Sequence, residues 1–335
     1  MFKLGVVHPA GLRSPSTLLG RDRYASFLLL CDLAKQPDVD PSDYDKLVGF
    51  APMPNGVWKQ TRRGRMQLVD RAVLALLRDW LNRGTNVAVA DLAASTGVTS
   101  VELYDLLRKE FDVRFVASDL YRDLIAVRSR RWSATVVFDP EGRPVQYIAG
   151  RLVLPAQLSE SALYPINRAA KAILTRWFVP AARNALKRLD IQTLRDFEAS
   201  RVDDFDVIRL PMLSKDTLEA VRADRGFGFE VWDILEPLPM TAHVVRAMNI
   251  LTRDHFSNAS RVRALRNCVD AVLPGGLFVV GWSPTLDPAA VEATIYRVVD
   301  GGLTELIQFN GGSEIDEIIA STFPIRRAKV FARVH

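Results

Sequence analysis

Apolar and polar positions in one stretch of the chain predict a strand, a helix and a second strand. Residues 87–90 are a run of Val and Ala, which is typical of a parallel strand covered on both faces. Residues 91–97 are mostly small, so the backbone there can turn sharply and approach a ligand. Residues 98–107 carry apolar side chains at helical spacing, and residues 113–117 form the second apolar run.

The pattern continues on both sides of this unit. A strong amphipathic helix is predicted over residues 66–81, and Gly84 ends it. Strands alternate with helices through the middle of the chain, and residues 207–210 are expected to be the third parallel strand. The other predicted helices are 21–35, 121–130, 214–225 and 258–273, and the other predicted strands are 135–138, 145–148, 227–232, 242–247, 277–281, 293–299, 305–309 and 325–333.

This order of elements favours an α/β fold with a mostly parallel sheet and a reversed edge. We expect residues 1–66 to form a helical and irregular N-terminal segment, and residues 67–335 to form the main domain. A helical insertion is expected at about residues 133–200 of that domain. The chain of 335 residues is long enough to bury the core that such an arrangement needs.

The composition narrows the class of protein. Apolar residues make up 48% of the chain and charged residues 25%, which is typical of a soluble globular protein, and the net charge is +5. Only two Cys and four scattered His are present, so neither a disulfide scaffold nor a metal site is expected. The sequence shows no signal-peptide pattern and no run long enough to span a membrane, so we expect a cytoplasmic protein.

The turn after the first strand indicates the kind of ligand. A dinucleotide-binding turn would read Gly-x-Gly-x-x-Gly, whereas residues 93–97 read Ala-Ala-Ser-Thr-Gly. Ser95 and Thr96 narrow the space that a pyrophosphate needs, and S-adenosylmethionine has no phosphate. Asp119 ends the second strand, where an acid can accept hydrogen bonds from ribose hydroxyls. The turn therefore favours S-adenosylmethionine over a nicotinamide cofactor, and an ordinary βαβ unit without a ligand remains open.

A second segment adds to this turn. Residues 246–251 read Arg-Ala-Met-Asn-Ile-Leu, and residues 273–281 read Leu-Pro-Gly-Gly-Leu-Phe-Val-Val-Gly. Together the segments resemble the class I S-adenosylmethionine-dependent methyltransferases, and within them they are most similar to the chemotaxis-receptor type. The resemblance covers roughly residues 67–119 and 227–283. It implies a Rossmann-like fold whose mostly parallel sheet has seven strands and an antiparallel C-terminal hairpin.

The resemblance also implies a set of cofactor-binding residues. Asp119, followed by Leu120, would bind the ribose, and Met248 would lie at the sulfonium. Asp233 and Ile234 would lie beside the adenine. The residues implied for the methionine portion are Asp91, Ala93, Ala94, Ser95, Thr96 and Gly97.

Two departures from the family pattern limit what is carried over. The two leading glycines of the usual turn are Ala93 and Ser95 here. The Glu pair of the chemotaxis type is Val98 and Thr99, so its specificity for protein glutamates is not carried over.

Methyl transfer mainly requires positioning of the two reactants, with a base only where the acceptor holds a proton of high pKa. Asn249 and, one loop further on, His255 are the candidate catalytic residues, whereas His243 is interpreted as a core histidine. A basic turn before the helix 66–81 is a candidate clamp for an anionic acceptor, and a solvated turn is the alternative. The clamp residues are Trp58, Arg62, Arg63 and Arg65.

Residues 161–189 form the other unusual segment, because they carry cations and no Asp or Glu. Their apolar residues recur at helical spacing and include Ile173 and Trp177. The segment has three interpretations: a surface helix packed through this apolar stripe, a lid over the acceptor pocket, or peripheral contact with an anionic membrane. No nucleic-acid-binding motif is visible, so no such partner is expected.

The sequence therefore predicts methyl transfer from S-adenosylmethionine to an oxygen or nitrogen of a small-molecule or glycan-type acceptor. A non-catalytic nucleoside-binding module on the same fold and a nicotinamide-dependent oxidoreductase are the alternatives.

Overall fold

The structure, a computed structural model, describes residues 26–35, 40–49, 59, 61–150, 152–156, 165–223 and 225–334. The chain divides into two compact units. Residues 61–120 and 216–335 make up one, here called the parallel-sheet unit, and residues 1–60 and 121–215 make up the other, the antiparallel-sheet unit. The sequence led us to expect boundaries at residue 66 and at about 133 and 200. The chain passes from one unit to the other after residues 60, 120 and 215.

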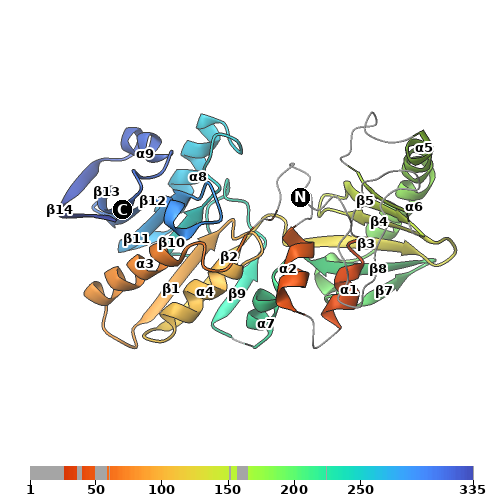
Figure 1. Cartoon of the computed structure of the whole chain (residues 1–335), viewed down its shortest axis with the longest axis horizontal. Coiled ribbons are helices and arrows are strands. Elements are labelled where there is room, and N and C mark those ends of the chain that lie inside the picture. The colour runs from red at the N-terminus through yellow and green to blue at the C-terminus, as the bar shows by residue number, and fades with distance from the viewer. Residues whose placement is uncertain are drawn as a thin grey trace. The chain divides into compact units, whose positions relative to one another are not determined.

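The parallel-sheet unit is built on β1 (Asn86–Leu92), which pairs in parallel with β2 (Asp112–Ser118) and with β10 (Ala242–Met248). β9 (Phe227–Glu230) lies in parallel beside β2, and β11 (Val272–Trp282) lies in parallel beside β10. Sequential strands therefore fan out on both sides of β1, so the order reverses there (Figure 1). The predicted α/β, Rossmann-like architecture is confirmed.

The far edge of this sheet differs from the expectation. β12 (Glu292–Val299) and β13 (Gly302–Phe309) form the predicted antiparallel hairpin beside β11. β14 (Ile325–Val334) then returns in parallel to β13, so the described sheet has 8 strands where seven were predicted. β14 corresponds to the strand predicted at 325–333, and it runs parallel to β13 because α9 (Asp316–Thr322) carries the chain back to the end of the sheet at which β13 begins.

Helices cover both faces of the parallel strands. Side chains alternate along β1, so Ala88, Ala90 and Leu92 face one side and Val87, Val89 and Asp91 the other. Ala90 and Leu92 belong to the core under α8 (Asn258–Asp270). The side of Asp91 is the side of α3 (Gln67–Trp80) and α4 (Val98–Leu107), because Asp70 of α3 and Ser100 of α4 reach the same charge network as Asp91. α7 (Lys215–Ala223) leads into β9.

The antiparallel-sheet unit corrects two predictions. Residues 121–130 were expected to be a helix, but Asp123–Ser129 is the central strand β3. Residues 207–210 were expected to be a parallel strand, but they belong to β8 (Phe205–Pro211), which is antiparallel to β3. The reason is that Leu124–Val127 is a short apolar run buried on both faces, and periodicity alone does not tell such a strand from a helix.

The other strands of this sheet are antiparallel to their neighbours, and the order is β6-β5-β4-β3-β8-β7. They are β4 (Ala134–Phe138), β5 (Pro144–Ala149), β6 (Leu152–Pro155) and β7 (Ala199–Val202). The helices are α1 (Leu29–Ala34), α2 (Pro41–Gly49), α5 (Pro165–Ile173) and α6 (Val179–Leu186), with a π-helical turn, η2 (Leu174–Phe178), between α5 and α6. The insertion predicted as helical is thus a sheet with one long helical segment against it.

Replacing Gly281 with Ala should destabilise the parallel-sheet unit. A Cβ at Gly281 would lie 2.6 Å from the Cβ of Ala293 and 2.7 Å from the carbonyl oxygen of Glu292, both on β12. Strand backbone cannot move away without breaking the ladder, so we expect a loss of about 1–3 kcal/mol in the free energy of unfolding, measured by urea denaturation.

Gly228 on β9 is the matched control, because the nearest atom to its Cβ position, the carbonyl oxygen of Phe115, is 3.9 Å away. Gly228→Ala should change stability by less than about 1 kcal/mol. Equal losses in the two variants would show that the close contact between β11 and β12 is not the cause.

Candidate functional site

The turn between β1 and α4 is held in an unusual backbone conformation. Ala93 has φ 54°, Ser95 has φ 59° and Gly97 has φ 80°, so three alternate residues are left-handed. Ala93 and Ser95 are the positions at which the resemblance places glycine. A residue with a Cβ costs roughly 1–2 kcal/mol in this region, and such strain concentrates at functional sites. The turn therefore keeps the path of a glycine-rich loop without two of its glycines.

Several amides of this turn are used within the protein. The N–H of Ala94 donates to the carbonyl of Ser118 at 2.8 Å, and the N–H of Ser95 donates to the carboxylate of Asp119 at 2.9 Å. The N–H of Gly97 donates to the carbonyl of Ala94 at 2.9 Å. These three donors are directed at protein oxygens, which leaves the turn poorly equipped to cradle an anion.

Gly97 is required by packing as well as by its φ. A Cβ there would lie 2.6 Å from Cγ2 of Thr217 on α7 and 2.9 Å from the ring of Phe229 on β9. The side chains of Thr217 and Phe229 thus occupy the space that the missing Cβ of Gly97 leaves. We interpret Gly97 as the residue that lets α7 and β9 pack against the turn.

A buried charge network lies directly behind the turn. Arg246 of β10 is 1% exposed, and its Nε and Nη2 donate to the two carboxylate oxygens of Asp91 at 2.9 and 2.6 Å. Its Nη1 donates to Asp70 of α3 at 2.6 Å. The hydroxyl of Ser100 in α4 donates to Asp91 at 2.5 Å. The network therefore joins four elements of the unit: β10, β1 and α3 through the guanidinium, and α4 through Asp91. Charge-assisted bonds with two parallel N–H donors are stronger and more specific than bonds between neutral groups.

The network contains more carboxyl groups than guanidinium groups. Burial raises the pKa of Asp70 to about 7, against the lowering effect of Arg246. Burial alone would lower the pKa of Arg246, but Asp91 and Asp70 raise it overall, so the guanidinium stays charged. Burial also raises the pKa of Glu102, which accepts the N–H of Gly64 at 2.8 Å. Arg246 thus bonds two carboxyl groups and acts electrostatically on a third, and a further cation near Asp70 and Glu102 would favour their ionised forms.

The residues predicted for ribose and adenine follow neighbouring strands. Asp119 comes directly after β2, and its N–H donates to the carbonyl of Glu230 on β9 at 3.2 Å. Asp233 accepts the N–H of Leu235 at 2.9 Å, which shapes the loop after β9. Ile234 is buried in the core with α8, and Leu120 is exposed.

Trp232 is a residue that the sequence did not single out. It lies beside Asp233, and its indole N–H is buried without an acceptor in the part of the chain that the structure describes. A buried donor of this kind costs free energy unless a ligand or a water accepts from it. Its only sequence signal is its place at the end of a parallel strand.

The structure joins two of the predicted acceptor-side residues through Ser283, which follows β11. The side-chain oxygen of Asn249 accepts the N–H of Ser283 at 2.6 Å, and the carbonyl of Ser283 accepts from Nη2 of Arg65 at 2.7 Å. Asn249 has φ 60°, and its N–H donates to Gly281 at 2.8 Å. Burial lowers the pKa of the Arg65 guanidinium. Met248, the last residue of β10, lies on the strand face of Arg246.

Of the remaining predicted residues, those that the structure describes are not part of the link through Ser283. Arg63 is ion-paired with Asp216, and Arg62 is exposed. Trp58 lies outside the described residues. The N–H of His255 donates to the carbonyl of Thr252 at 3.3 Å, and the ring is partly exposed.

His243 behaves as predicted for a core histidine. Its Nδ1 accepts the N–H of Ala88 at 3.0 Å, and burial lowers its pKa. Among the described residues, no group of three or more His, Cys, Asp or Glu could hold a metal ion. No described helix is long and apolar enough to cross a membrane.

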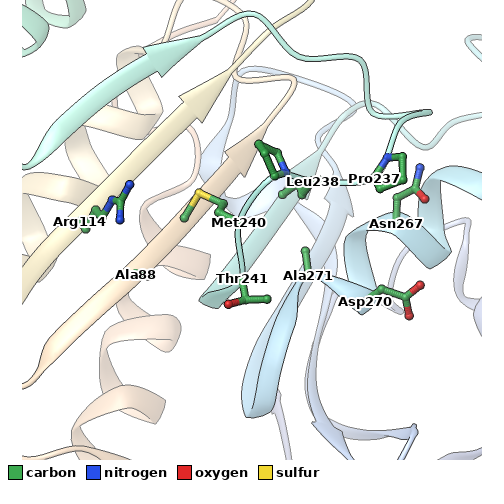
Figure 2. A pocket seen from close by; sticks show the side chains of 10 residues that line it. Ala88, Arg114, Pro237, Leu238, Met240, Thr241, Asn267, Asp270 and Ala271 are labelled. Atoms are coloured by element: carbon green, nitrogen blue, oxygen red, sulfur yellow. The ribbon is translucent and has the colours of Figure 1, made fainter.

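A groove lies elsewhere on the parallel-sheet unit (Figure 2). Its volume is about 670 Å³, and it is bordered by the loop before β10, the end of α8 and the first halves of β1 and β2. Its lining residues are Ala88, Arg114, Pro237, Leu238, Pro239, Met240, Thr241, Asn267, Asp270 and Ala271. Ala88 faces the opposite side of β1 from Asp91. The groove thus lies away from the carboxyl ends of the strands, where open α/β sheets bind their ligands.

Comparisons with known proteins found distant structural similarities. No family model and no curated protein matches the chain. Among solved structures, it is similar to the N-methyltransferase NodS from Bradyrhizobium japonicum, crystallised with S-adenosyl-L-homocysteine, at 10% identity and TM-score 0.28, with 68% of this chain and 67% of that chain covered. It is similar to the CurJ carbon methyltransferase at 13% identity and TM-score 0.33, with 77% and 48% covered.

It is also similar to the [4+2]-cyclase SpnF at 13% identity and TM-score 0.27, with 67% of this chain and 49% of that chain covered. The chain thus spans about half the length of SpnF and of CurJ. Similarities with TM-scores this low carry no argument about this chain, so both the fold and the chemistry of the site rest on its own residues.

Raising the pH through 7 should cost the wild type more stability than it costs an Asp70→Asn variant. The folded-state pKa of Asp70 is raised from the usual 3.8 to about 7 by burial, so between these values the folded chain holds a proton that the unfolded chain has released. The stability from this proton is complete below about pH 4 and is lost as the pH rises through about 7. The amide in the variant does not titrate, but its oxygen can still accept from Arg246. Urea unfolding at about pH 5 and about pH 8 measures the difference.

Asp112→Asn is the matched control, because Asp112 is an exposed carboxylate at the start of β2. It should keep the wild-type loss between the two pH values. If Asp70→Asn loses as much stability as the wild type, Asp70 is not the group that takes up the proton.

Proposed function

We propose that the parallel-sheet unit is a class I methyltransferase that uses S-adenosylmethionine. The observation that carries the proposal is the number of carboxyl groups behind the Ala93–Gly97 turn. Asp70 and Asp91 pair with the guanidinium of Arg246 there, and Glu102 lies within its electrostatic influence. S-adenosylmethionine brings a sulfonium, an ammonium and a carboxylate group, with a net positive charge, whereas a dinucleotide brings a diphosphate. The excess of carboxyl groups favours the first ligand and opposes the second.

The residues at the carboxyl ends of the strands suit the uncharged parts of this cofactor. Asp119 would bind the ribose, and its bond to the N–H of Ser95 holds the carboxylate against the turn. Asp233 and Trp232 would lie beside the adenine, where the buried indole N–H of Trp232 could donate a hydrogen bond to the ring. The turn itself, from Ala93 to Gly97, would receive the methionine portion, with Asp91 acting through its charge from behind.

The acceptor side would be formed by Asn249 and Arg65, held together by Ser283. When bound, the cofactor supplies an activated methyl group, so the protein must position the acceptor and exclude water. Arg65 would orient an anionic or polar acceptor, and Asn249 would place the acceptor atom. His255 would remove a proton where the acceptor needs it. We propose an oxygen or nitrogen of a small-molecule or glycan-type acceptor; the closer similarity to chemotaxis-receptor methyltransferases stays a hypothesis.

A non-catalytic nucleoside-binding module is the second candidate. Two observations favour it: Thr217 and Phe229 fill the space above Gly97, and the Asp91 carboxylate is fully engaged by Arg246 and Ser100. Such a module would bind the cofactor without forming S-adenosylhomocysteine in the presence of any acceptor.

Titration calorimetry should show saturable binding of S-adenosylmethionine and of S-adenosylhomocysteine, with Kd values on the order of micromolar. NAD and NADP should give no saturable heat at the same concentrations, because the acidic surroundings of the turn repel their diphosphate. Saturable binding of NAD together with no binding of S-adenosylmethionine would reverse the assignment.

Asp119→Ala should weaken the binding of S-adenosylhomocysteine by about tenfold or more, because a ribose partner is lost. Asp119→Asn should show a smaller loss, since its amide oxygen can still accept the N–H of Ser95. Asp105→Ala, which removes an exposed carboxylate of α4 that pairs with Arg108, is the control and should bind as the wild type does. Unchanged affinity in Asp119→Ala, with circular dichroism confirming the fold, would show that the ribose lies elsewhere.

A further inference from the structure

A continuous helical rod in the antiparallel-sheet unit presents apolar side chains to solvent. α5, η2 and α6 follow one another without a break from Pro165 to Leu186 (Figure 1). Ile173 is 60% exposed and Trp177 is 67% exposed. With Ala169, which is also exposed, they recur at every fourth residue and form a ridge along the rod. Packing through this apolar stripe was one of three interpretations of the sequence, and the exposure of Ile173 and Trp177 does not support it.

A π-helical turn, η2, contains Trp177 and separates α5 from α6. It makes a wider turn than an α-helix, so the residues after it are rotated relative to the spacing that the sequence suggests. Phe178, Val179 and Ala182 pack into the core of the unit. Trp177, the neighbour of Phe178, remains outside. Turns of this type are frequent at functional positions.

The charge of the rod has one sign. Residues 161–189 contain no Asp or Glu, and their cations are Arg168, Lys171, Arg176, Arg183, Lys187 and Arg188. Arg188 is ion-paired with Asp203. Lys171 donates to the carbonyl of Ala156, and Arg183 donates to the carbonyl of Gly142. The guanidinium of Arg176 lies 5.8 Å from the ring centre of Trp177, so cation and aromatic ring occupy the same surface.

We propose that this rod surface, formed by Ala169, Ile173, Trp177 and the flanking Arg176 and Lys187, docks on an anionic lipid bilayer. A helix that lies in the membrane plane needs an apolar ridge with Trp and a row of cations for the lipid headgroups, and the rod has both. The absence of carboxyl groups in residues 161–189 favours a uniformly anionic surface over a protein partner, whose interface would carry both signs of charge. The proposal is independent of the methyltransferase assignment.

Co-sedimentation of the full chain with vesicles tests the proposal. The chain should bind vesicles of phosphatidylcholine that contain about 30% phosphatidylglycerol, and it should bind pure phosphatidylcholine vesicles at least about tenfold more weakly. Raising the salt concentration to about 1 M should release most of it, because the headgroup attraction is then screened. Equal binding to both kinds of vesicle, or no binding to either, would overturn the proposal.

Variants assign the binding to the rod. Ile173→Ser/Trp177→Ser removes the ridge at exposed positions and should lower the vesicle partition coefficient by about tenfold or more. Arg176→Gln/Lys187→Gln should weaken binding and reduce its salt dependence. Val231→Ser/Leu286→Ser, which removes two exposed apolar side chains from the parallel-sheet unit, is the matched control and should bind normally. If the ridge variant binds as tightly as the wild type, the rod is not the docking surface.

Discussion

The ion pair between Arg246 and Asp91 is the interaction on which the parallel-sheet unit depends. It joins two neighbouring strands at the ends where ligands of such sheets bind, and Asp70 and Ser100 tie two helices to the same network. A buried arginine is tolerated only where its charge and its donors are met, because an unpaired charge in the interior costs several kcal/mol. Its partners therefore fix where α3 and α4 begin their packing against the sheet.

The same network supports the ligand proposed for the turn above it. Its carboxyl groups outnumber its guanidinium groups, and burial raises the pKa of Asp70. Under the proposed function, a fold whose strand order would suit a diphosphate accepts a cationic ligand instead. The strained backbone at Ala93 and Ser95 adds to this, because two Cβ atoms stand where a diphosphate-binding turn would present bare backbone.

The two units differ in how completely their apolar side chains are buried. In the parallel-sheet unit, apolar faces of strands and helices are covered on both sides of the sheet, apart from the groove beside Ala88 where the connection from β9 to β10 has no described helix. In the antiparallel-sheet unit, one long helical segment buries Phe178 and leaves Trp177 in solvent. Neighbouring residues have opposite environments there because consecutive side chains of a helix point in different directions.

The sequence by itself determined the parallel-sheet unit to within a few residues. Strands β1, β2 and β10 and helices α3, α4 and α8 follow from apolar spacing, because a parallel strand buried on both faces and an amphipathic helix have distinct periods. It also located the turn at Ala93–Gly97, because small residues let the backbone turn sharply between a strand and a helix. It failed at β3, where a short buried run has the same composition in a strand as in a helix.

Only the tertiary structure decided which charges meet. Arg246 lies 155 residues from Asp91 and 176 from Asp70 along the chain, and no local pattern encodes a pairing over such distances. The link from Asn249 to Arg65 through Ser283, the buried indole of Trp232 and the exposure of Trp177 have the same origin. Each depends on the register of strands or the phase of a helix, which packing sets once the whole core is assembled.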